Sequence, residues 1–348
     1  MSRNIRVSII MSVFNGEKYL NKAIDSILNQ IYSDFEFIII NDGSTDKTHD
    51  ILKSYTDPRI RVVNQNNMGL IQSLNRGIYL AIGEYIARQD ADDISLPERI
   101  KEQVKIMDND PKIVLLGSFC YLIDDNDDIK KIEKYPQTDT QIRWKMIFVN
   151  AFCHTSMMIR SKTIKNMNLF YSENDLHAED YGLWSEVMKY GSCYNIDKPL
   201  VKYRAHPNQI SNVHSNTQEY SALLITKKNM ERMGIHIPNL DAIRKLKCLE
   251  YEFPANLDYE DIIICKYYIQ LLNNFLKEKY INKIQFRQIM RIRLYHMCNS
   301  IKLRNLWEIY NSGLLYEIYK ANKYYYLKYI LIRGVKNITG HWRNTFKQ

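Results

Sequence analysis

The sequence lacks closely spaced cysteine pairs and long apolar runs. Its six cysteines are widely spaced and include no C-x-x-C pair, which favours buried, reduced thiols over a disulfide framework or a zinc site. The polar first residues lead directly into an apolar run at Val7, so we expect no signal peptide. No apolar run reaches the ~20 residues of a membrane span, and Ile262–Phe275, interrupted by Lys266, is better explained as a buried helix. We therefore expect a cytoplasmic protein.

Positive charge is concentrated near the C-terminus. The formal net charge is +9, and residues 301–348 hold nine Lys or Arg against two Glu, a net of +7, together with seven Tyr and two Trp. Basic and aromatic residues together favour peripheral contact with the anionic inner face of the cytoplasmic membrane, and a solvated basic tail explains them equally well. Nucleic acid is not an expected partner, because no recognition motif accompanies the charge.

Apolar runs alternate with amphipathic helical patterns through the first ninety residues. Four runs have the length of strands: Val7–Val13, Phe35–Ile40, Ile60–Val63 and Glu84–Ala87. This alternation predicts an α/β, Rossmann-like fold with a mostly parallel central sheet and flanking helices. Beyond Ser211 only helical patterns occur, so we expect an α/β domain over 1–215 and an all-helical region over 216–348.

Two local signals lie between the fourth strand and residue 128. Ser95 and Glu98 have the spacing of a capping box, with Pro97 in the first turn, and predict a helix start at that position. Ile113–Ile123 predicts a further strand, which an acidic turn over 124–128 closes.

Polar clusters follow two of the predicted strands, at the sheet edge where parallel α/β proteins bind ligands. The second strand ends in Asn41-Asp42-Gly43-Ser44, where a carboxylate beside a glycine turn could contact a nucleotide base, and helix capping is the alternative. The fourth ends in Asp90-Ala91-Asp92-Asp93, whose carboxylates repel one another unless a cation compensates them. Mg²⁺ and Mn²⁺ take such ligands, which favours a metal site over a surface loop.

Two later segments carry titratable residues at the ends of predicted elements. Glu179 and Asp180 begin a helix, where either helix capping or a general base acting on an acceptor hydroxyl explains them. Arg204 and His206 follow a short strand, where the histidine could join an aspartate on the metal while the arginine meets phosphate oxygens.

In this order and spacing, over about residues 5–215, these motifs resemble glycosyltransferase family 2, the inverting nucleotide-sugar transferases of GT-A fold. The segment Ala178–Ser211 is most similar to bacterial lipooligosaccharide N-acetylhexosaminyltransferases. Besides Glu179-Asp180 and His206, the motifs that carry the resemblance are Val7 to Gly16, Asn41-Asp42-Gly43-Ser44, Asn67-Met68-Gly69, Leu74-Asn75-Arg76-Gly77 and Gly83 to Asp93.

The resemblance implies which residues of the site bind the nucleotide of the donor. It implies that Asp42 contacts the uracil of a UDP-sugar donor and that Asp90 lies near the ribose. Asn15 and Asn67 belong to the motifs that line the nucleotide pocket, and Arg204 is expected beside the diphosphate.

The resemblance also implies a metal and an acceptor end. Asp92 and His206 are expected to hold Mn²⁺ or Mg²⁺, and Asp180 to act as the catalytic base with Glu179 next to it. His154 occupies a family element near the acceptor, where acceptor contact and structural hydrogen bonding are equally good explanations. The implied reaction moves GlcNAc or GalNAc, with Glc or Gal as next choices, to a hydroxyl of an oligosaccharide or lipid-linked glycan. It belongs to bacterial surface polysaccharide or lipooligosaccharide synthesis and gives a β-linkage.

Two rival functions remain open at this point. A nucleotidyltransferase also combines a parallel sheet with metal-binding aspartates, but it would carry a glycine- and arginine-rich phosphate loop, which the segment Phe14–Tyr19 lacks. An inactive nucleotide-sugar-binding scaffold would not need Asp92, Asp180 and His206, and their presence argues against loss of catalysis.

The basic C-terminal stretch generates a direct test. If it contacts a membrane, deleting residues 322–348 should release the protein from anionic vesicles, because each lost Lys or Arg removes about 1 kcal/mol of attraction. Co-sedimentation of the full-length and truncated chains at low salt measures this. Equal binding by both, or none by either, would identify the stretch as a solvated tail, and added salt should weaken true membrane binding.

Overall fold

The computed structural model describes residues 5–207, 209–251 and 259–300, so the basic stretch 301–348 lies outside the described residues. Contacts divide the chain into two compact units, Met1–Ile225 and Thr226–Gln348. The division falls inside helix α9 (Ser215–Arg232), whose first residue is the expected end of the α/β domain. Each unit is described by itself below.

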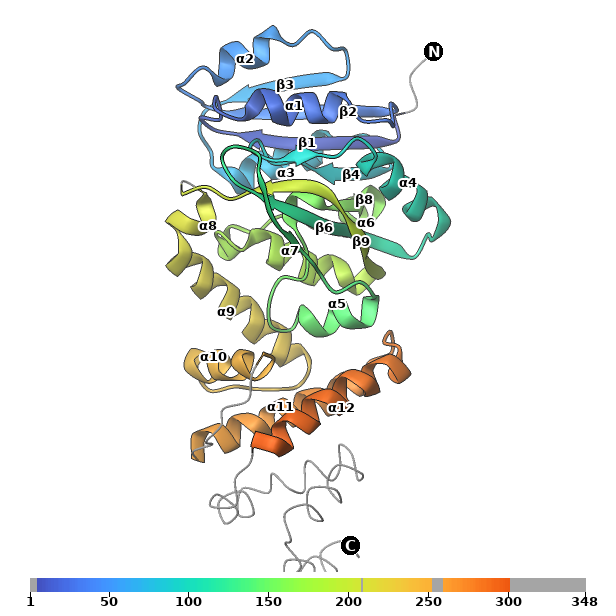
Figure 1. The fold of residues 1–348 in the computed structure, drawn as a ribbon, viewed down its shortest axis with the longest axis vertical. Helices are drawn as coiled ribbons and strands as arrows, with labels where there is room; N and C mark the ends of the chain where they lie inside the picture. The colour runs from blue at the N-terminus through green and yellow to red at the C-terminus, as the bar shows by residue number, and fades with distance from the viewer. Residues whose placement is uncertain (1–4, 208, 252–258, 301–348) are drawn as a thin grey trace, which may run out of the picture. The chain divides into compact units, whose positions relative to one another are not determined.

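A single sheet runs through the first unit (Figure 1), in the strand order β3-β2-β1-β4-β8-β6-β9-β5, with β7 paired to β6. Its strands are, in chain order, β1 (Val7–Val13), β2 (Phe35–Asp42), β3 (Ile60–Gln65), β4 (Tyr85–Arg88), β5 (Ile94–Ser95), β6 (Ile113–Ile123), β7 (Ile129–Glu133), β8 (Met158–Arg160) and β9 (Ser192–Arg204).

The N-terminal half of the sheet is parallel, as the sequence predicts. β1 pairs in parallel with both β2 and β4, and β2 pairs in parallel with β3. The second half is mixed: β8 is antiparallel to β4 and β6, and β9 runs parallel to β6. The strands predicted from the apolar runs are all present, which confirms the predicted α/β fold class.

Helices bury both faces of the parallel half. Alternate residues of each strand enter different cores, so that Ile38 packs with α3 (Leu70–Leu80) and Phe37 packs with α1 (Leu20–Leu28). Strands covered on both faces need continuous apolar sequence, which explains the uninterrupted runs. The carboxyl ends of these strands therefore remain the accessible edge.

The first unit contains further α-helices, and the last of them, α9, continues into the second unit. They are α2 (Thr48–Ser54), α4 (Arg99–Asn109), α5 (Asp139–Lys145), α6 (Ser161–Asn166), α7 (Glu179–Val187) and α8 (Ile210–Val213), together with α9. The capping box predicted at Ser95 is wrong. Ser95 ends β5, its hydroxyl donates to Gln89 Oε1 at 2.7 Å, and α4 begins at Arg99 without a side-chain cap. Pairing with β9 therefore prevailed over the local signal.

The described part of the second unit is helical. It contains α10 (Leu240–Leu249), α11 (Tyr259–Lys277) and α12 (Lys283–Ser300). The apolar run Ile262–Phe275 lies in α11, where Ile262, Leu272 and Phe275 are buried, as expected. Within the described ranges, no helix is both long enough and apolar enough to span a bilayer.

The five cysteines whose side chains the structure describes form no disulfide. Cys120, Cys153, Cys193 and Cys265 are free and buried, as the wide spacing predicts. Cys248 is free but exposed, so the expectation of burial is wrong for this residue.

Candidate active site

A cleft of about 680 Å³ opens at the carboxyl ends of β1, β2 and β4. The structure brings nearly all of the sequence-predicted site residues to its walls: Asn15, Asp42, Asn67, Asp90, Asp92, His154, Glu179, Asp180 and His206. Arg204 is the exception and does not line the cleft. Residues far apart in the sequence thus meet at the sheet edge where α/β folds bind ligands.

Two loops at one end of the cleft are tied together by hydrogen bonds. The backbone N–H of Asn15 donates to Ser44 Oγ at 3.0 Å, and Asn15 Oδ1 accepts from Thr45 N at 2.8 Å. Gly43 has φ +75°, and a Cβ there would lie 2.6 Å from the backbone nitrogen of Asn67. Only glycine allows this close approach without displacing the Asn67 loop.

Asp42 anchors the loop that contains Asn67 by accepting hydrogen bonds from its backbone. It is the last residue of β2, and its carboxylate accepts from the backbone N–H groups of Met68 and Gly69, both at 2.9 Å. Gln65 Nε2 donates to the same carboxylate at 2.7 Å. Asp42 is almost fully buried and still lines the cleft, and both of its carboxylate oxygens already accept hydrogen bonds from the protein.

The three carboxylates after β4 each meet a different partner. Asp90 forms an ion pair with the buried guanidinium of Arg88, and Asp92 Oδ2 lies 3.0 Å from His206 Nε2. Asp93 is buried, and its Oδ1 accepts from the backbone N–H of Arg204 at 2.8 Å while its Oδ2 has no hydrogen-bond partner. Burial, and then the charges of Asp92 and Asp90, raise the pKa of Asp93 well above its usual value.

Asp92 and His206 are the residues best placed to hold a divalent ion. Their 3.0 Å separation matches the roughly 3 Å between adjacent ligands of an octahedral ion with bonds of about 2.1 Å. Among the described residues, no group of three or more His, Cys, Asp or Glu is arranged to hold a metal. Mg²⁺ typically takes only one or two protein carboxylates and completes its shell with phosphate oxygens and water. The pair fits an ion shared with a diphosphate.

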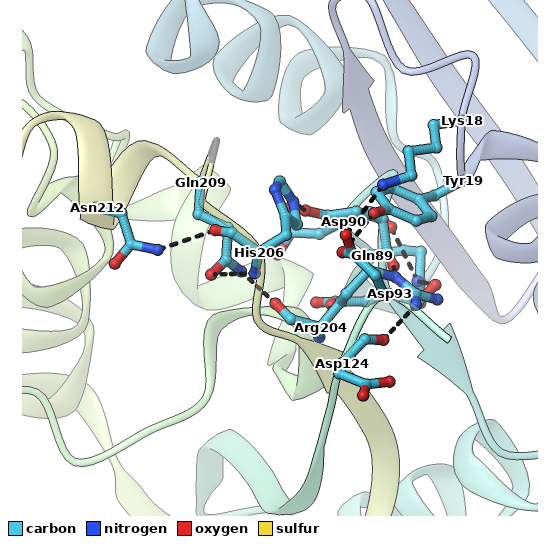
Figure 2. Close-up of polar contacts among 12 residues, drawn as sticks. Lys18, Tyr19, Gln89, Asp90, Asp93, Asp124, Arg204, His206, Gln209 and Asn212 are labelled. Carbon is cyan, nitrogen blue, oxygen red and sulfur yellow. Dashed lines mark hydrogen bonds and ion pairs between the residues drawn. The ribbon is translucent and has the colours of Figure 1, made fainter. Parts of the chain in front are cut away.

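Arg204 lies behind this pair rather than in the cleft. Its side chain is fully buried, Nε donates to the carbonyl of Asp92 at 2.8 Å, and Nη1 donates to the carbonyl of Asp124 at 2.8 Å. Figure 2 shows Arg204 among Asp93, Asp124 and Tyr19, next to His206. The position expected beside a phosphate differs from the observed one, because these internal acceptors hold the guanidinium below the surface of the cleft.

Glu179 and Asp180 begin α7 and line the same cleft. Burial and then the neighbouring Asp180 raise the pKa of Glu179 to about 7. Burial also raises the pKa of Asp180 to about 6, against the opposing hydrogen bonds from Tyr181 and Asn150. Asn150 Nδ2 donates to Asp180 Oδ2 at 2.7 Å, while its own Oδ1 accepts from Phe152 N at 3.1 Å. The amide is thus fixed at both ends and orients the Asp180 carboxylate.

His154 also lines the cleft, and its ring contacts Tyr171 and Trp184. Its Nε2 lies 2.9 Å from the hydroxyl of Tyr171, and its ring meets Trp184 edge to face at 6.0 Å. Burial, and then the charge of Arg88, lower its pKa to about 3, so the imidazole is neutral at physiological pH. Both expected explanations of His154 therefore remain compatible with its position.

Several residues of the cleft carry no recognisable sequence signal. Tyr19, Asp125, His177 and Gln218 line it, and Asn150 lies behind the lining and contacts Asp180. Asp125 lies in the acidic turn over 124–128, which the sequence marks only as the end of a strand. Their contributions depend on which segments the fold brings together, so only the structure identifies them.

Comparison with known sequences identifies the class of protein to which this chain belongs. The sequence profile of the family described as Glycosyl transferase family 2 matches residues 8–167. An uncharacterized glycosyltransferase of Haemophilus influenzae is 34% identical over 298 residues, covering 78% of this chain and 90% of the relative. The Escherichia coli O-antigen biosynthesis glycosyltransferase WbnJ is 35% identical, covering 58% and 80%.

The fold has a counterpart among solved structures. S. aureus TarS, residues 1–349, superposes with a TM-score of 0.53 at 16% identity, covering 94% of this chain and 92% of TarS. The mixed sheet with its parallel N-terminal half is accordingly a GT-A fold. The sequence relatives show that the protein is a glycosyltransferase. The chain belongs to glycosyltransferase family 2, which confirms the resemblance and leaves the nucleotidyltransferase alternative without support.

The raised pKa of the buried Asp180 carboxyl predicts that its contribution to the free energy of unfolding falls as pH rises. The pKa of Asp180 is raised from 3.8 to about 6, so the folded state retains a proton that the unfolded chain has lost. This stabilisation is complete below the unfolded value and lost as pH rises through the folded value. Asp180→Asn should remove about 1–3 kcal/mol of this dependence. Urea unfolding of wild type and Asp180→Asn at acidic and neutral pH measures the free energy of unfolding at each pH. An equal change of this free energy with pH in both proteins would contradict the raised pKa of Asp180.

Proposed function

We propose that this glycosyltransferase transfers a sugar from a UDP-sugar to a hydroxyl of a glycan acceptor with inversion, so that an α-linked donor gives a β-glycoside. The observation that carries the proposal is one cleft lined by the Asp92–His206 pair and by the carboxylate of Asp180. GlcNAc or GalNAc is the first choice of sugar, followed by Glc or Gal. TarS crystallised with UDP and with UDP-GlcNAc is consistent with a UDP-sugar donor.

The proposed biological setting is bacterial surface polysaccharide or lipooligosaccharide synthesis. WbnJ, a relative at 35% identity, is described as an O-antigen biosynthesis glycosyltransferase, which supports this setting. The acceptor would be an oligosaccharide or a lipid-linked glycan. Residues 1–215 would form the catalytic domain, and the helical remainder with its basic C-terminal stretch would contact the cytoplasmic membrane surface.

At the donor end, we assign the uracil to Asp42 and the ribose to Asp90. Asp42 lies beside the loop of Asn67, and the Asn15 loop is hydrogen-bonded to the residues that follow Asp42, so these residues form one continuous wall. Arg88 holds the Asp90 carboxylate by an ion pair, which keeps the oxygens of Asp90 oriented before a ligand enters. Preorganised polar groups lower the entropy lost on binding.

Asp92 and His206 would hold Mn²⁺ or Mg²⁺ beside the diphosphate. When bound, the ion would stabilise the negative charge that grows on the departing UDP. The two side chains are partly exposed toward the cleft and already have the spacing of adjacent ligands, which limits the rearrangement that binding requires.

Asp180 would act as the general base and Glu179 as its neighbour. Burial raises the pKa of both carboxyls, and the hydrogen bonds from Tyr181 and Asn150 oppose that rise at Asp180, which favours Asp180 as the ionised member of the pair. Asn150 and the N–H of Tyr181 stabilise the charged form of Asp180 and direct one lone pair of each oxygen. Asp180 would accept the hydroxyl proton as the acceptor oxygen attacks the anomeric carbon opposite the leaving UDP.

The metal assignment predicts a dependence on divalent ions. Transfer should stop in EDTA and return with Mn²⁺ or Mg²⁺, and Asp92→Asn should lose at least ~100-fold in turnover, because the ion would contribute several kcal/mol to the transition state. UDP release from UDP-sugars with an oligosaccharide acceptor measures both effects. Undiminished transfer in chelator would exclude the proposed role of Asp92 and His206.

The base assignment predicts different effects for the two neighbouring carboxyls. Asp180→Asn should keep the fold and UDP binding but lose ~10²–10⁴-fold in kcat, because an amide cannot accept the proton. Glu179→Gln is the matched control and should retain far more activity. The reverse ranking would make Glu179 the base. Analysis of the product by NMR tests the stereochemistry, and retained anomeric configuration would contradict the displacement mechanism.

A further inference from the structure

Arg204 joins several segments of the first unit at one buried point. Its backbone N–H donates to Asp93 Oδ1, and its Nε donates to the carbonyl of Asp92, both at 2.8 Å. Its Nη1 donates to the carbonyl of Asp124 at 2.8 Å, and its Nη2 pairs with Asp127 Oδ1 at 2.6 Å. The end of β9 is thereby tied both to the acidic loop after β4 and to the turn between β6 and β7.

The face of the guanidinium is also occupied. Arg204 Cζ lies 4.3 Å from the centroid of the Tyr19 ring, and the same ring lies 5.5 Å from the ring of His206. The Tyr19 hydroxyl donates a hydrogen bond to Asp125 Oδ1 at 2.7 Å, which holds the ring in place. The edges and one face of the fully buried guanidinium thus contact protein groups (Figure 2). Arg204 is not among the residues that line the cleft. A phosphate in the cleft would not reach it directly.

The same contacts govern the spacing of Asp92 and His206. Asp92 is held through its own carbonyl, and His206 lies two residues beyond Arg204 on the same chain segment. Gln209 Nε2 donates to the carbonyl of Arg204, and Asn212 Nδ2 donates to the carbonyl of His206 at 2.9 Å. The backbones that carry the two side chains are therefore fixed relative to each other through Arg204.

Charge balance keeps this arrangement stable without a solvent contact. A buried guanidinium needs an opposite charge, and Asp127 supplies it. Lys22 pairs with the same carboxylate from α1, on the outside of the turn. The acidic turn over 124–128 therefore has a specific task that its sequence does not reveal, which is to neutralise and orient Arg204.

We propose that Arg204 is a positioning residue for the Asp92–His206 pair and not a ligand of the donor phosphates. It acts through the Asp92 carbonyl, the Asp93 carboxylate and the Tyr19 ring, and it holds the two metal-binding side chains at the spacing that an octahedral ion requires. This inference rests on the proposed assignment of the divalent ion to Asp92 and His206. Outer groups that orient metal ligands commonly change metal affinity by 10–100-fold when they are removed.

The test separates metal affinity from nucleotide affinity. Arg204→Met should weaken Mn²⁺ binding at least about tenfold, measured by EPR of free Mn²⁺ with saturating UDP. Affinity for UDP in EDTA, measured by calorimetry, should stay within about twofold, because no contact with the nucleotide is lost. A direct phosphate ligand would instead lose about tenfold or more in UDP affinity without metal, since hydrogen bonds to charged groups are strong.

A matched control removes Lys22, the second basic side chain that pairs with Asp127. Lys22→Met takes away a partner of Asp127 but touches neither Asp92 nor His206, so Mn²⁺ affinity should stay within about twofold of wild type. Arg204→Lys retains the buried charge for Asp127 and loses the planar fork, which makes it the deciding variant if Arg204→Met fails to fold. Circular dichroism and Tm establish which variants are folded.

The outcomes distinguish this inference from the proposed function. If wild-type protein with UDP binds no Mn²⁺, the metal assignment fails and the inference fails with it. If wild type binds Mn²⁺ and the folded Arg204 variants bind it equally well, the role of Arg204 alone is overturned. A fall in metal-free UDP affinity in those variants would overturn it as well. Weakened Mn²⁺ binding with unchanged metal-free UDP affinity supports it.

Discussion

Repulsion among the carboxylates that follow β4 is the constraint on which the arrangement of the site depends. Asp90, Asp92 and Asp93 lie within four residues at the accessible edge of the sheet. The fold separates them by giving each a partner from a different segment, namely Arg88, His206 and the backbone N–H of Arg204. Because only Asp92 and Asp90 line the cleft, the charge that remains available to a ligand is concentrated near His206.

The carboxylates that line the cleft are stabilised in different ways. Arg88 compensates Asp90 directly, whereas burial dominates at Glu179 and Asp180 and raises the pKa of both. A compensated carboxylate suits contact with a nucleotide or an ion, and a carboxylate with a raised pKa suits proton transfer. This electrostatic contrast agrees with the proposed roles of these residues.

Buried arginines support the site without entering it. Arg88, Arg99 and Arg204 are all fully buried in the first unit. Arg99 donates to the carbonyl of Arg88 at 2.7 Å and to Ser95 Oγ at 2.8 Å, so it holds the end of β4 from the core side. A planar guanidinium donates up to five hydrogen bonds in fixed directions, whereas a lysine ammonium has three donors and no fixed fork. This property explains how an irregular acidic loop stays ordered above the core.

Much of the architecture followed from the sequence alone. The apolar runs from Val7, Phe35 and Ile113 became strands because residues buried on both faces must be continuously apolar, a requirement that local sequence records directly. The polar residues after those strands converged at one edge for the same topological reason, so the membership of the cleft was largely predictable. The capping signal at Ser95 failed because strand pairing with β9, a distant segment, outweighed a local hydrogen bond.

What the sequence could not reveal depended on contacts between segments far apart in the chain. The chemistry of Arg204 suited a phosphate, and only the tertiary structure directed its guanidinium into the protein, onto Asp124, Asp127 and Tyr19. Asn150 was likewise invisible until the fold brought it 2.7 Å from Asp180. Residue type determines which partners a side chain can accept, but its direction and its competing partners are set by packing. The sequence therefore determined the family, the sheet and the set of acidic residues, and tertiary structure decided which of them face the cleft.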